Sequence, residues 1–495
     1  MMSPNRYTGG LEATLQGRLA QRESQGRLRQ LVTPRTDLVD FSSNDYLSLS
    51  QDLDLRNAVI AHLANPDINK QQQQQQPSPS SNGRTLGSGG SRLLDGNSDF
   101  VEYLEKKVSK FHGSEAALLF NSAYDANVGL ISCVPGYDDV IIYDNLIHAS
   151  IHDGMRLSRA TKRIPFEHSS IVSGGTSRSG MNDLGITDCH GLEGVLRQLT
   201  EVNEDVRSGK SNVFICIEAL YSMDGDVADL EYVSAIVKSL LPHGNGYVIV
   251  DEAHSVGVLG DGGRGLVCQL SLEDQTWVRV LGFGKAVGCA GGLLCQIPMS
   301  WYLIADFSLT IGAILCSSIT RLYLINYART LIYTTAMSFP SLASINAAYD
   351  YLMTGKADQR RNQLKTLVEY CHNKLKSLDH DLRPAVAPIR MLEGHPSSSP
   401  IIPLFTNYPK SLARYCQRSG FMVRPIVAPT VPLGQERIRI CLHATNTTEQ
   451  IDNLCRVLET WARDSIQEGE RNQTQVITST EKFQDSPLEI EKPKL

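Results

Sequence analysis

The sequence is poor in cysteine, in basic residues and in metal-ligand spacings. Eleven cysteines in 495 residues are too few for a disulfide-stapled scaffold and are typical of reduced thiols in an intracellular compartment. Neither a C-x-x-C pair nor an H-E-x-x-H motif occurs, so no metal site is predicted. Lys and Arg number 47 against 53 Asp and Glu, a formal charge of -6, which gives no electrostatic argument for nucleic-acid binding, since such binders need a basic surface.

Targeting and membrane-spanning patterns are also scarce. The first residues carry no apolar stretch that suits a secretory signal, and they fit a mitochondrial leader poorly. Residues 297–325 are apolar, but Asp306 and Arg321 interrupt them, and because a charge inside a bilayer is costly we predict no membrane span. The C-terminal Pro-Lys-Leu is a variant of the Ser-Lys-Leu peroxisomal address, so peroxisomal and cytoplasmic locations are the two alternatives.

What remains is the pattern of a globular α/β protein, with 41% hydrophobic and 20% charged residues. From Thr85 onward, β-rich apolar runs alternate with helical stretches, as in βαβ units. The near-continuous apolarity of the runs is typical of parallel strands covered on both faces. The predicted strands cover residues 116–120, 139–143, 213–217, 247–251 and 277–281.

Changes in composition divide the chain. We predict an N-terminal arm with a helix over residues 1–60 and a Gln/Pro/Ser-rich surface loop over 66–85. Residues 86–340 are assigned to a large α/β domain and residues 341–465 to a smaller α+β domain. Residues 466–495 are polar and lack periodicity, which predicts a disordered tail.

The motif with the clearest chemistry is DEAHSVGVLGDGGRG, residues 251–265, directly after an apolar run. An acid at the carboxyl end of a parallel strand lies where α/β sheets bind ligands. The letters DEAH also suggest a helicase, but no G-x-x-x-x-G-K-[ST] loop precedes them, which argues against a nucleotide triphosphatase.

Lys285 follows the next strand, in the glycine-rich segment GFGKAVG. By itself such a lysine is commonly a solvated loop residue. Together with Asp251, however, it fits a pyridoxal-phosphate (PLP) enzyme, which needs a Schiff-base lysine and an acid at the pyridinium nitrogen. His254, three residues after Asp251, is placed to reach the ring oxygen.

These motifs stand in the order found in the α-oxoamine synthases, and the chain resembles this PLP-dependent family over residues 25–460. The motifs that carry the resemblance are DFSSNDYLSLS, GSGGSRLLDGN, EAALLFNSAYDANVG, DNLIHAS, EALYSMDGD, DEAHSVGVLGDGGRG, GFGKAVG, ARTLIYTTAM and APTVPLGQERIRI. The resemblance implies a fold-type I structure, with a mostly parallel, seven-stranded-type sheet in the PLP-binding domain and a smaller C-terminal α+β domain. It also implies a homodimer.

The implied reaction is the decarboxylative condensation of an amino acid with an acyl-CoA. SSNDYL, LIYTTAM and APTVPLGQERIRI favour the biotin-pathway members of the family, which join L-alanine to pimeloyl-CoA. Glycine C-acetyltransferases, 5-aminolevulinate synthases and serine palmitoyltransferases share much of the motif set and remain alternatives. A catalytically inactive relative that acts as a structural partner is a further alternative.

Cofactor-site roles transfer onto matching positions of this chain. The resemblance implies that Lys285 forms the Schiff base and removes the Cα proton, that Asp251 pairs with the pyridine nitrogen, and that His148 stacks on the ring. The other implied contacts are a ring-hydroxyl pair, His254 and Ser222, and a backbone phosphate pair, Ala123 and Tyr124, with Ala123 in place of the usual glycine. For His148 the structural alternative is a buried imidazole, and for Ser222 a turn residue.

Substrate-binding roles transfer in the same way. Arg29, Asn44 and Arg439 match positions that recognise substrate carboxylates, for which the arginine fork is well suited. Thr430 matches a further substrate contact, and Thr334 and Thr335 are expected to reach the cofactor of a neighbouring subunit together with GSGGSR. Arg29 is alternatively a charge on a helix surface.

The chain departs from the family pattern at two places. Gly282 stands where the family has a hydroxyl residue that contacts the phosphate, which predicts weaker cofactor binding. Residues 292–311 separate GKAVGCAG from GAILCSS, and joining Gly291 to Gly312 restores the family spacing. We interpret this stretch, which is expected to split a strand beside the active site, as a translated, unspliced intron; a genuine insertion is the alternative.

Overall fold

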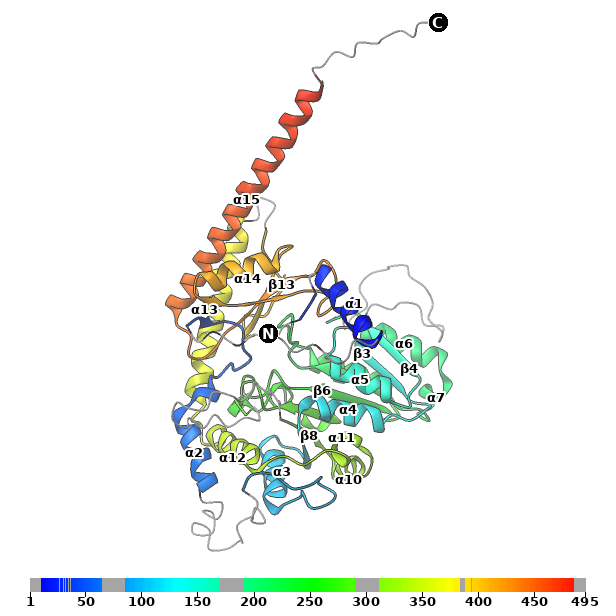
Figure 1. The fold of residues 1–495 in the computed structure, drawn as a ribbon. Helices are drawn as coiled ribbons and strands as arrows, with labels where there is room; N and C mark the ends of the chain where they lie inside the picture. The colour runs from blue at the N-terminus through cyan, green and yellow to red at the C-terminus, as the bar shows by residue number, and fades with distance from the viewer. Residues whose placement is uncertain are drawn as a thin grey trace.

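The computed structural model describes residues 10–25, 27–29, 31, 33, 35, 37–64, 85–169, 191–289, 311–382, 388–392 and 394–484. Its centre is a seven-stranded sheet in the order β2-β8-β7-β6-β5-β3-β4, in which β8 runs antiparallel to both of its neighbours and the other strands are parallel (Figure 1). The strands are β2 (Ala116–Phe120), β3 (Val140–Asp144), β4 (Lys162–Phe166), β5 (Val213–Glu218), β6 (Gly246–Asp251), β7 (Val278–Gly282) and β8 (Gly312–Cys316). This confirms the predicted α/β fold; β4 was not among the predicted strands, and β8 was expected only as the strand interrupted by residues 292–311.

Helices cover both faces of this sheet, as its apolar strands require. Val140 and Ile142 of β3 belong to the core on one face, and Ile141 between them belongs to the core on the other. The first face carries α6 (Leu192–Val202), α7 (Glu204–Arg207), α8 (Leu230–Leu240) and α9 (Leu266–Gln269). The second carries α4 (Ala123–Cys133), α5 (Ala149–Leu157), α10 (Ser318–Tyr327) and α11 (Arg329–Ile332).

A third core joins the large domain to the small one. One apolar stripe of α3 (Asp99–Phe111) faces this core, where Phe100, Leu104 and Val108 are buried. This helix packs with α2 (Leu53–Ala64) and α12 (Phe339–Met353) at the lower end of the molecule (Figure 1). The hydroxyl of Ser98 caps α3 by accepting a hydrogen bond from the Val101 amide, which explains why the helix begins there.

The small domain contains a four-stranded antiparallel sheet in the order β12-β13-β10-β9. Its strands are β9 (Arg390–Met391), β10 (Ile401–Phe405), β12 (Arg424–Ile426) and β13 (Arg437–Cys441), and its helices are α13 (Asp358–Leu382), α14 (Pro409–Arg418) and α15 (Thr448–Gln484). β1 (Val39–Asp40) pairs with β11 (Phe421–Met422), so the N-terminal arm adds to this domain.

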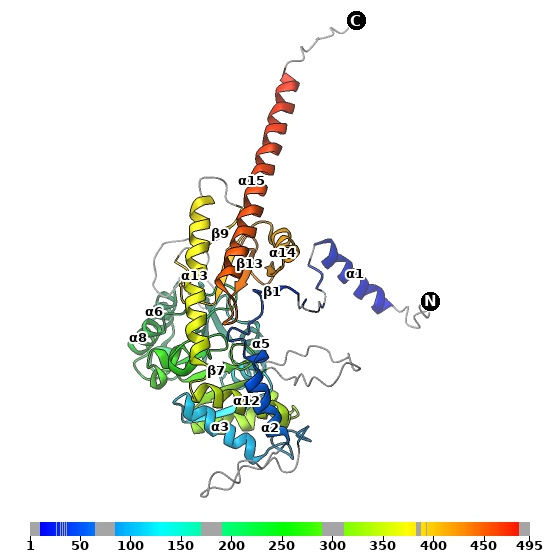
Figure 2. The same ribbon diagram turned by 90° about the vertical axis from the view of Figure 1, so that its left-hand side faces the viewer.

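The two ends of the chain differ from each other in packing. The predicted N-terminal helix is present as α1 (Gly10–Ser24), and none of its residues is buried. Helix α15 packs beside α13 and then projects away from the body (Figures 1 and 2). It continues to Gln484, whereas the sequence predicted an irregular tail from residue 466; no proline occurs before Pro487 to stop the helix.

Several predictions fall outside the described residues, namely the loop over 66–84, the stretch 292–310 and the C-terminal tripeptide. Within the described ranges, no helix is both long enough and apolar enough to cross a bilayer.

The unusual stretch at 292–311 enters the fold at a tight junction. The Phe283 amide donates to the Ile311 carbonyl at 2.7 Å, and the Cys289 amide donates to the Phe283 carbonyl at 2.8 Å. Both flanks therefore meet at one residue. β8 begins directly afterwards, at Gly312, and pairs in unbroken register with β7 and β2. Contrary to expectation, the stretch precedes this strand rather than splitting it.

Deleting residues 292–311 should therefore leave a folded protein, because the flanks already lie together. Ala290 and Gly291 would join Cys289 to Gly312, and the shorter loop reduces the entropy cost of pairing β7 with β8. We expect an unfolding temperature no more than about 4 °C below that of the full chain, measured by circular dichroism. The matched deletion of 292–310 keeps the buried Ile311 and isolates its contribution. Collapse of both variants would contradict the intron interpretation, as would a mature transcript that encodes the stretch.

Candidate active site

The carboxyl ends of β5 and β6 place two acids side by side. Glu218 and Asp251 are the last residues of these strands and are register partners. Both are buried, with 3% and 6% of their surfaces exposed. Burial and the neighbouring Asp251 carboxylate raise the pKa of Glu218 well above its usual range. Burial thus favours the protonated form of the Glu218 carboxyl beside Asp251.

Hydrogen bonds hold the Asp251 carboxylate in one orientation. Asn127 Nδ2, on α4, donates to Oδ2 at 2.7 Å, and the Ala253 amide donates to Oδ1 at 2.9 Å. The same Asn127 nitrogen donates to Ser150 Oγ at 3.0 Å, which in turn lies 2.8 Å from Nδ1 of His148. His148 stands at the N-terminus of α5 and remains exposed, so it can still stack on a planar ring.

Lys285 lies three residues beyond the end of β7. Burial lowers the pKa of its ammonium group to about 8, with the Arg439 guanidinium acting in the same direction and the Asp251 and Glu218 carboxyls opposing it. At pH 7 roughly a tenth of the amine is therefore uncharged and free to act as a nucleophile or a base, as the predicted role requires.

His254 occupies the fully enclosed side of the site, with 5% of its surface exposed. Burial, reinforced by the cations of Lys285 and Arg439, holds the pKa of its imidazole well below the usual range, so the ring is neutral. Its Nδ1 lies 2.7 Å from the Tyr46 hydroxyl, which is 3.3 Å from Asn44 Oδ1. The N-terminal SSNDYL motif thus contacts the DEAH motif directly.

Arg439 of β13 extends from the small domain toward this site. Its NH1 donates to the Ser222 carbonyl at 2.9 Å, and its NH2 donates to Asn44 Oδ1 at 3.0 Å. Only 9% of Arg439 is exposed, and its Nε lies buried with no hydrogen-bond partner among the described residues. An unpaired buried donor is costly, so this guanidinium is suited to an anion that the protein itself does not supply.

The predicted phosphate cradle is the first turn of α4. Ser122 caps this eleven-residue helix by accepting from the Asp125 amide, and Ala123 and Tyr124 are its first two residues. The amides of a first turn have no partner inside the helix, so they and the helix dipole favour an anion. Gly312 packs here without a side chain, since a Cβ at that position would lie 2.5 Å from the Ala123 backbone.

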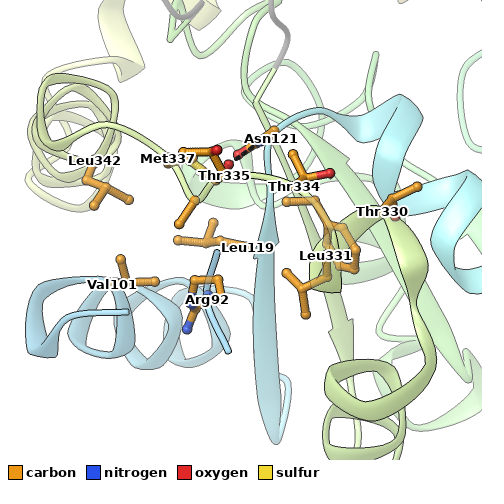
Figure 3. Close-up of a pocket in the computed structure, with 12 residues that line it drawn as sticks. Arg92, Val101, Leu119, Asn121, Thr330, Leu331, Thr334, Thr335, Met337 and Leu342 are labelled. Carbon is orange, nitrogen blue, oxygen red and sulfur yellow. Dashed lines mark hydrogen bonds between the residues drawn. The ribbon is translucent and has the colours of Figure 1, made fainter. Parts of the chain in front are cut away.

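Four predicted residues do not join this cluster. Arg29 and Thr430 are exposed. Thr334 and Thr335 line a separate pocket with Arg92, and Asn121 Nδ2 donates to the Thr335 carbonyl there at 2.8 Å (Figure 3). Ser91 of GSGGSR pairs with Thr335 in a β-bridge, so these two motifs do meet. Neither Lys285, Asp251, His148 nor His254 lines that pocket.

Comparison with known proteins agrees with this arrangement. The family model that describes aminotransferases of class I and II matches residues 36–458. The 8-amino-7-oxononanoate synthase of Emericella nidulans is 43% identical over 91% of this chain and 96% of its own. The aminoacyl transferase sphA of Aspergillus fumigatus is 33% identical, over 87% and 82%. A solved structure of SPT with a PLP internal aldimine covers 92% of this chain and 99% of its own, with a TM-score of 0.69 and 21% identity.

The chain is an α-oxoamine synthase of the aminotransferase class I and II family. Its cofactor is PLP, and the residues described above fit that group. The first turn of α4 suits the phosphate, the buried Asp251 suits the protonated ring nitrogen, and Lys285 suits the aldehyde.

In this α-oxoamine synthase, attachment of PLP should follow the titration of Lys285. The bond to the cofactor forms from the neutral amine, and a pKa of about 8 leaves roughly a tenth of the amine neutral at pH 7. We expect the rate constant for reconstitution of the apoenzyme, followed by absorbance, to rise with pH and level off above about pH 8. A rate that keeps rising toward the ordinary lysine value of 10.5 would show that burial does not perturb this amine.

Gly282, the departure predicted to weaken cofactor binding, ends β7 against Ala253. A Cβ at position 282 would lie 2.8 Å from the Ala253 Cβ, closer than side chains approach. We therefore expect Gly282→Thr alone to lower the unfolding temperature without tightening PLP binding. Adding Ala253→Gly should make room for the hydroxyl and lower the PLP dissociation constant roughly tenfold or more, the value of one charge-assisted hydrogen bond.

The control for that experiment is Ala253→Gly alone, which opens the space without adding the hydroxyl. Fluorescence titration of the apoenzymes with PLP gives all the dissociation constants. If the double variant binds PLP no more tightly than this control, the hydroxyl has no role at position 282.

Sequence reasoning missed three residues of the site. Glu218 carried the same signal as Asp251, since both end an apolar run that leads into a quoted motif. Tyr46 lies inside SSNDYL, but nothing in that motif indicates contact with His254. Asn127 lies on a helix whose packing angle decides which side chain faces the sheet, and no residue spacing predicts that angle.

Proposed function

We propose that the chain condenses L-alanine with pimeloyl-CoA to form 8-amino-7-oxononanoate, CoA and CO2. This proposal rests on two groups placed around Asp251. They are the Lys285 amine, part of which is uncharged near neutral pH, and the Arg439 guanidinium, whose Nε has no hydrogen-bond partner among the described residues. Such a site binds an α-amino acid by its carboxylate and removes a proton from its Cα.

The residues divide the work between them. Arg439 holds the carboxylate of the amino acid, and Asn44 keeps the guanidinium oriented. Bound PLP supplies the electron sink that stabilises negative charge at Cα. Lys285 takes the Cα proton and later returns one, while His254 stays neutral and offers a hydrogen bond to the ring oxygen. Asp251, fixed by Asn127 and Ala253, keeps the ring nitrogen protonated.

The identity of the substrates rests on similarity. The Emericella nidulans relative named 8-amino-7-oxononanoate synthase is 43% identical over nearly the full length of both chains. A second candidate is condensation of another amino acid and acyl-CoA, since the relative named aminoacyl transferase sphA is 33% identical over 87% of the chain.

The deciding experiment compares substrate pairs on the purified holoenzyme, with CoA release followed by a thiol reagent. We expect kcat/KM for alanine with pimeloyl-CoA to exceed that for glycine with acetyl-CoA or succinyl-CoA, and for serine with palmitoyl-CoA, by at least about tenfold. A preference for one of the other pairs would replace the proposed substrates. No release with any pair, and no absorbance change on adding PLP, would indicate an inactive structural partner.

We further propose a homodimer in which the pocket around Arg92, Thr334 and Thr335 faces the partner's site. Support comes from the meeting of GSGGSR with these threonines in a pocket apart from Lys285. Inactive Lys285→Ala and inactive Thr334→Arg chains should regain activity when mixed. One site of the mixed dimer then combines an intact Lys285 from one chain with an intact Thr334 from the other. Activity that stays at the sum of the two variants would count against shared sites.

A further inference from the structure

Two arginines of β13 form hydrogen bonds to the same turn of the large domain. Arg437 and Arg439 are two residues apart and so lie on one face of the strand. Arg439 NH1 donates to the Ser222 carbonyl at 2.9 Å, whereas Arg437 NH1 donates to the Met223 carbonyl at 3.5 Å and pairs with the Asp224 carboxylate. Three consecutive residues of the turn that follows β5 are thus held by one strand of the small domain.

The large domain fixes this turn from its other side. Nε2 of His168, after β4, lies 3.3 Å from Asp226 Oδ1 and 3.8 Å from Asp224 Oδ2, while its Nδ1 lies 3.0 Å from Asp144 Oδ1. Burial alone would lower the pKa of His168, but hydrogen bonds to Asp144 and Asp226 raise it to about 10. His168 is therefore a cation at neutral pH that ties the ends of β3 and β4 to the turn.

The turn also packs closely against the small-domain sheet, with no space between their backbones for a side chain. Gly225 has a φ of +71°, and a Cβ there would lie 2.0 Å from the Ile401 carbonyl of β10. Arg437 itself has no exposed surface, and its Cζ lies 4.3 Å from the centre of the Phe405 ring. Separating a buried guanidinium from its carboxylate leaves an unpaired buried charge, which is strongly unfavourable. The Arg437–Asp224 ion pair therefore resists any shift of β13 against the turn.

We propose that Arg437 is a positioning residue for Arg439, the proposed carboxylate-binding residue. The Arg437–Asp224 pair sets where β13 stands relative to the Ser222–Asp224 segment, and through the strand it sets where the Arg439 guanidinium stands relative to Lys285. The geometric demand is high, because a misplacement of about 1 Å in a bound substrate can cost roughly 10²-fold in rate. The inference rests on the proposed function, since it needs a substrate carboxylate.

A test must separate placement of Arg439 from general weakening of the fold. Ethylamine is alanine without its carboxylate, so the ratio of the two dissociation constants reports on the carboxylate site alone. Both are measured by absorbance titration of PLP-loaded enzyme. For Arg437→Met we expect the alanine constant to rise roughly 10- to 100-fold while the ethylamine constant and the cofactor spectrum stay unchanged. Arg437→Lys, which keeps the charge, should restore part of the preference.

Two further variants complete the design. Asp224→Asn removes the partner and should reproduce the loss with Arg437 intact. Lys374→Met breaks a small-domain ion pair with Asp452 that does not touch the turn, and it should leave the ratio unchanged. The proposal is overturned if Arg437→Met and Asp224→Asn keep the ratio of the unmodified enzyme, or if both amines weaken by one common factor.

The same titration distinguishes this inference from the proposed function. If the unmodified enzyme responds to ethylamine but binds alanine, glycine and serine no better, the carboxylate role of Arg439 is wrong, and the positioning role falls with it. If the unmodified enzyme prefers the amino acids and the Arg437 variants keep that preference, the function stands and only the positioning role is wrong.

Discussion

Replacing Lys285 by alanine is expected to lower kcat by roughly 10⁴-fold or more. A general base by itself contributes about 10²–10⁴-fold, and this residue also supplies the bond to PLP. Two neighbouring groups are poor substitutes: burial raises the pKa of Glu218 well above its usual range, and His254 is held by Tyr46. The measurement is CoA release from the best substrate pair, with enzyme concentrations high enough to detect a 10⁴-fold loss.

The control for this loss is Lys210→Ala. It removes an exposed lysine that pairs with Asp205 just before β5, at the opposite end of that strand from the site. Its kcat should match that of the unmodified enzyme. If Lys285→Ala kept more than about 1% of the rate, another residue would have to move the Cα proton. Added small amines should restore part of the activity, because they can enter the space that the lysine leaves.

Much of the site was predictable because its residues sit at the ends of apolar runs. Parallel strands bring their carboxyl ends to one edge, so Asp251, Lys285 and the first turn of α4 had to converge once the runs were read as a parallel sheet. The direction of β8 was not predictable, since GAILC is as apolar as the parallel strands. Its direction follows from the short junction at Phe283, which sequence spacing conceals behind residues 292–311.

Contacts between segments far apart in the chain were the hardest to predict. The buried Arg437 and the exposed Arg29 are both arginines near apolar residues, and only the packing of β13 on the turn after β5 distinguishes them. Arg29 and Thr430 were assigned from the family resemblance, and in the single chain they stay at the surface. A tertiary contact depends on strand register and domain approach, which local residue patterns do not specify.

Asp251→Asn is expected to have opposite effects on two rates: it should slow turnover and speed the attachment of PLP. Asp251 accepts from Asn127 at its Oδ2 and from the Ala253 amide at its Oδ1, and an amide side chain can accept at only one of these positions. Loss of the charge at the ring nitrogen should lower kcat by roughly 10²–10³-fold, as for other preorganised groups.

The same substitution should shift the reconstitution profile to lower pH. The Asp251 carboxylate raises the pKa of Lys285 against the larger lowering by burial, so removing it moves that pKa below about 8. The apoenzyme should then attach PLP faster at pH 7 even though the reconstituted enzyme turns over more slowly. Glu218→Gln is the matched comparison, because the Glu218 carboxyl raises the pKa of Lys285 less than Asp251 does and its replacement should shift the profile less. A variant that only distorted the site would slow both reactions, whereas opposite changes in attachment and turnover require the charge of Asp251 itself.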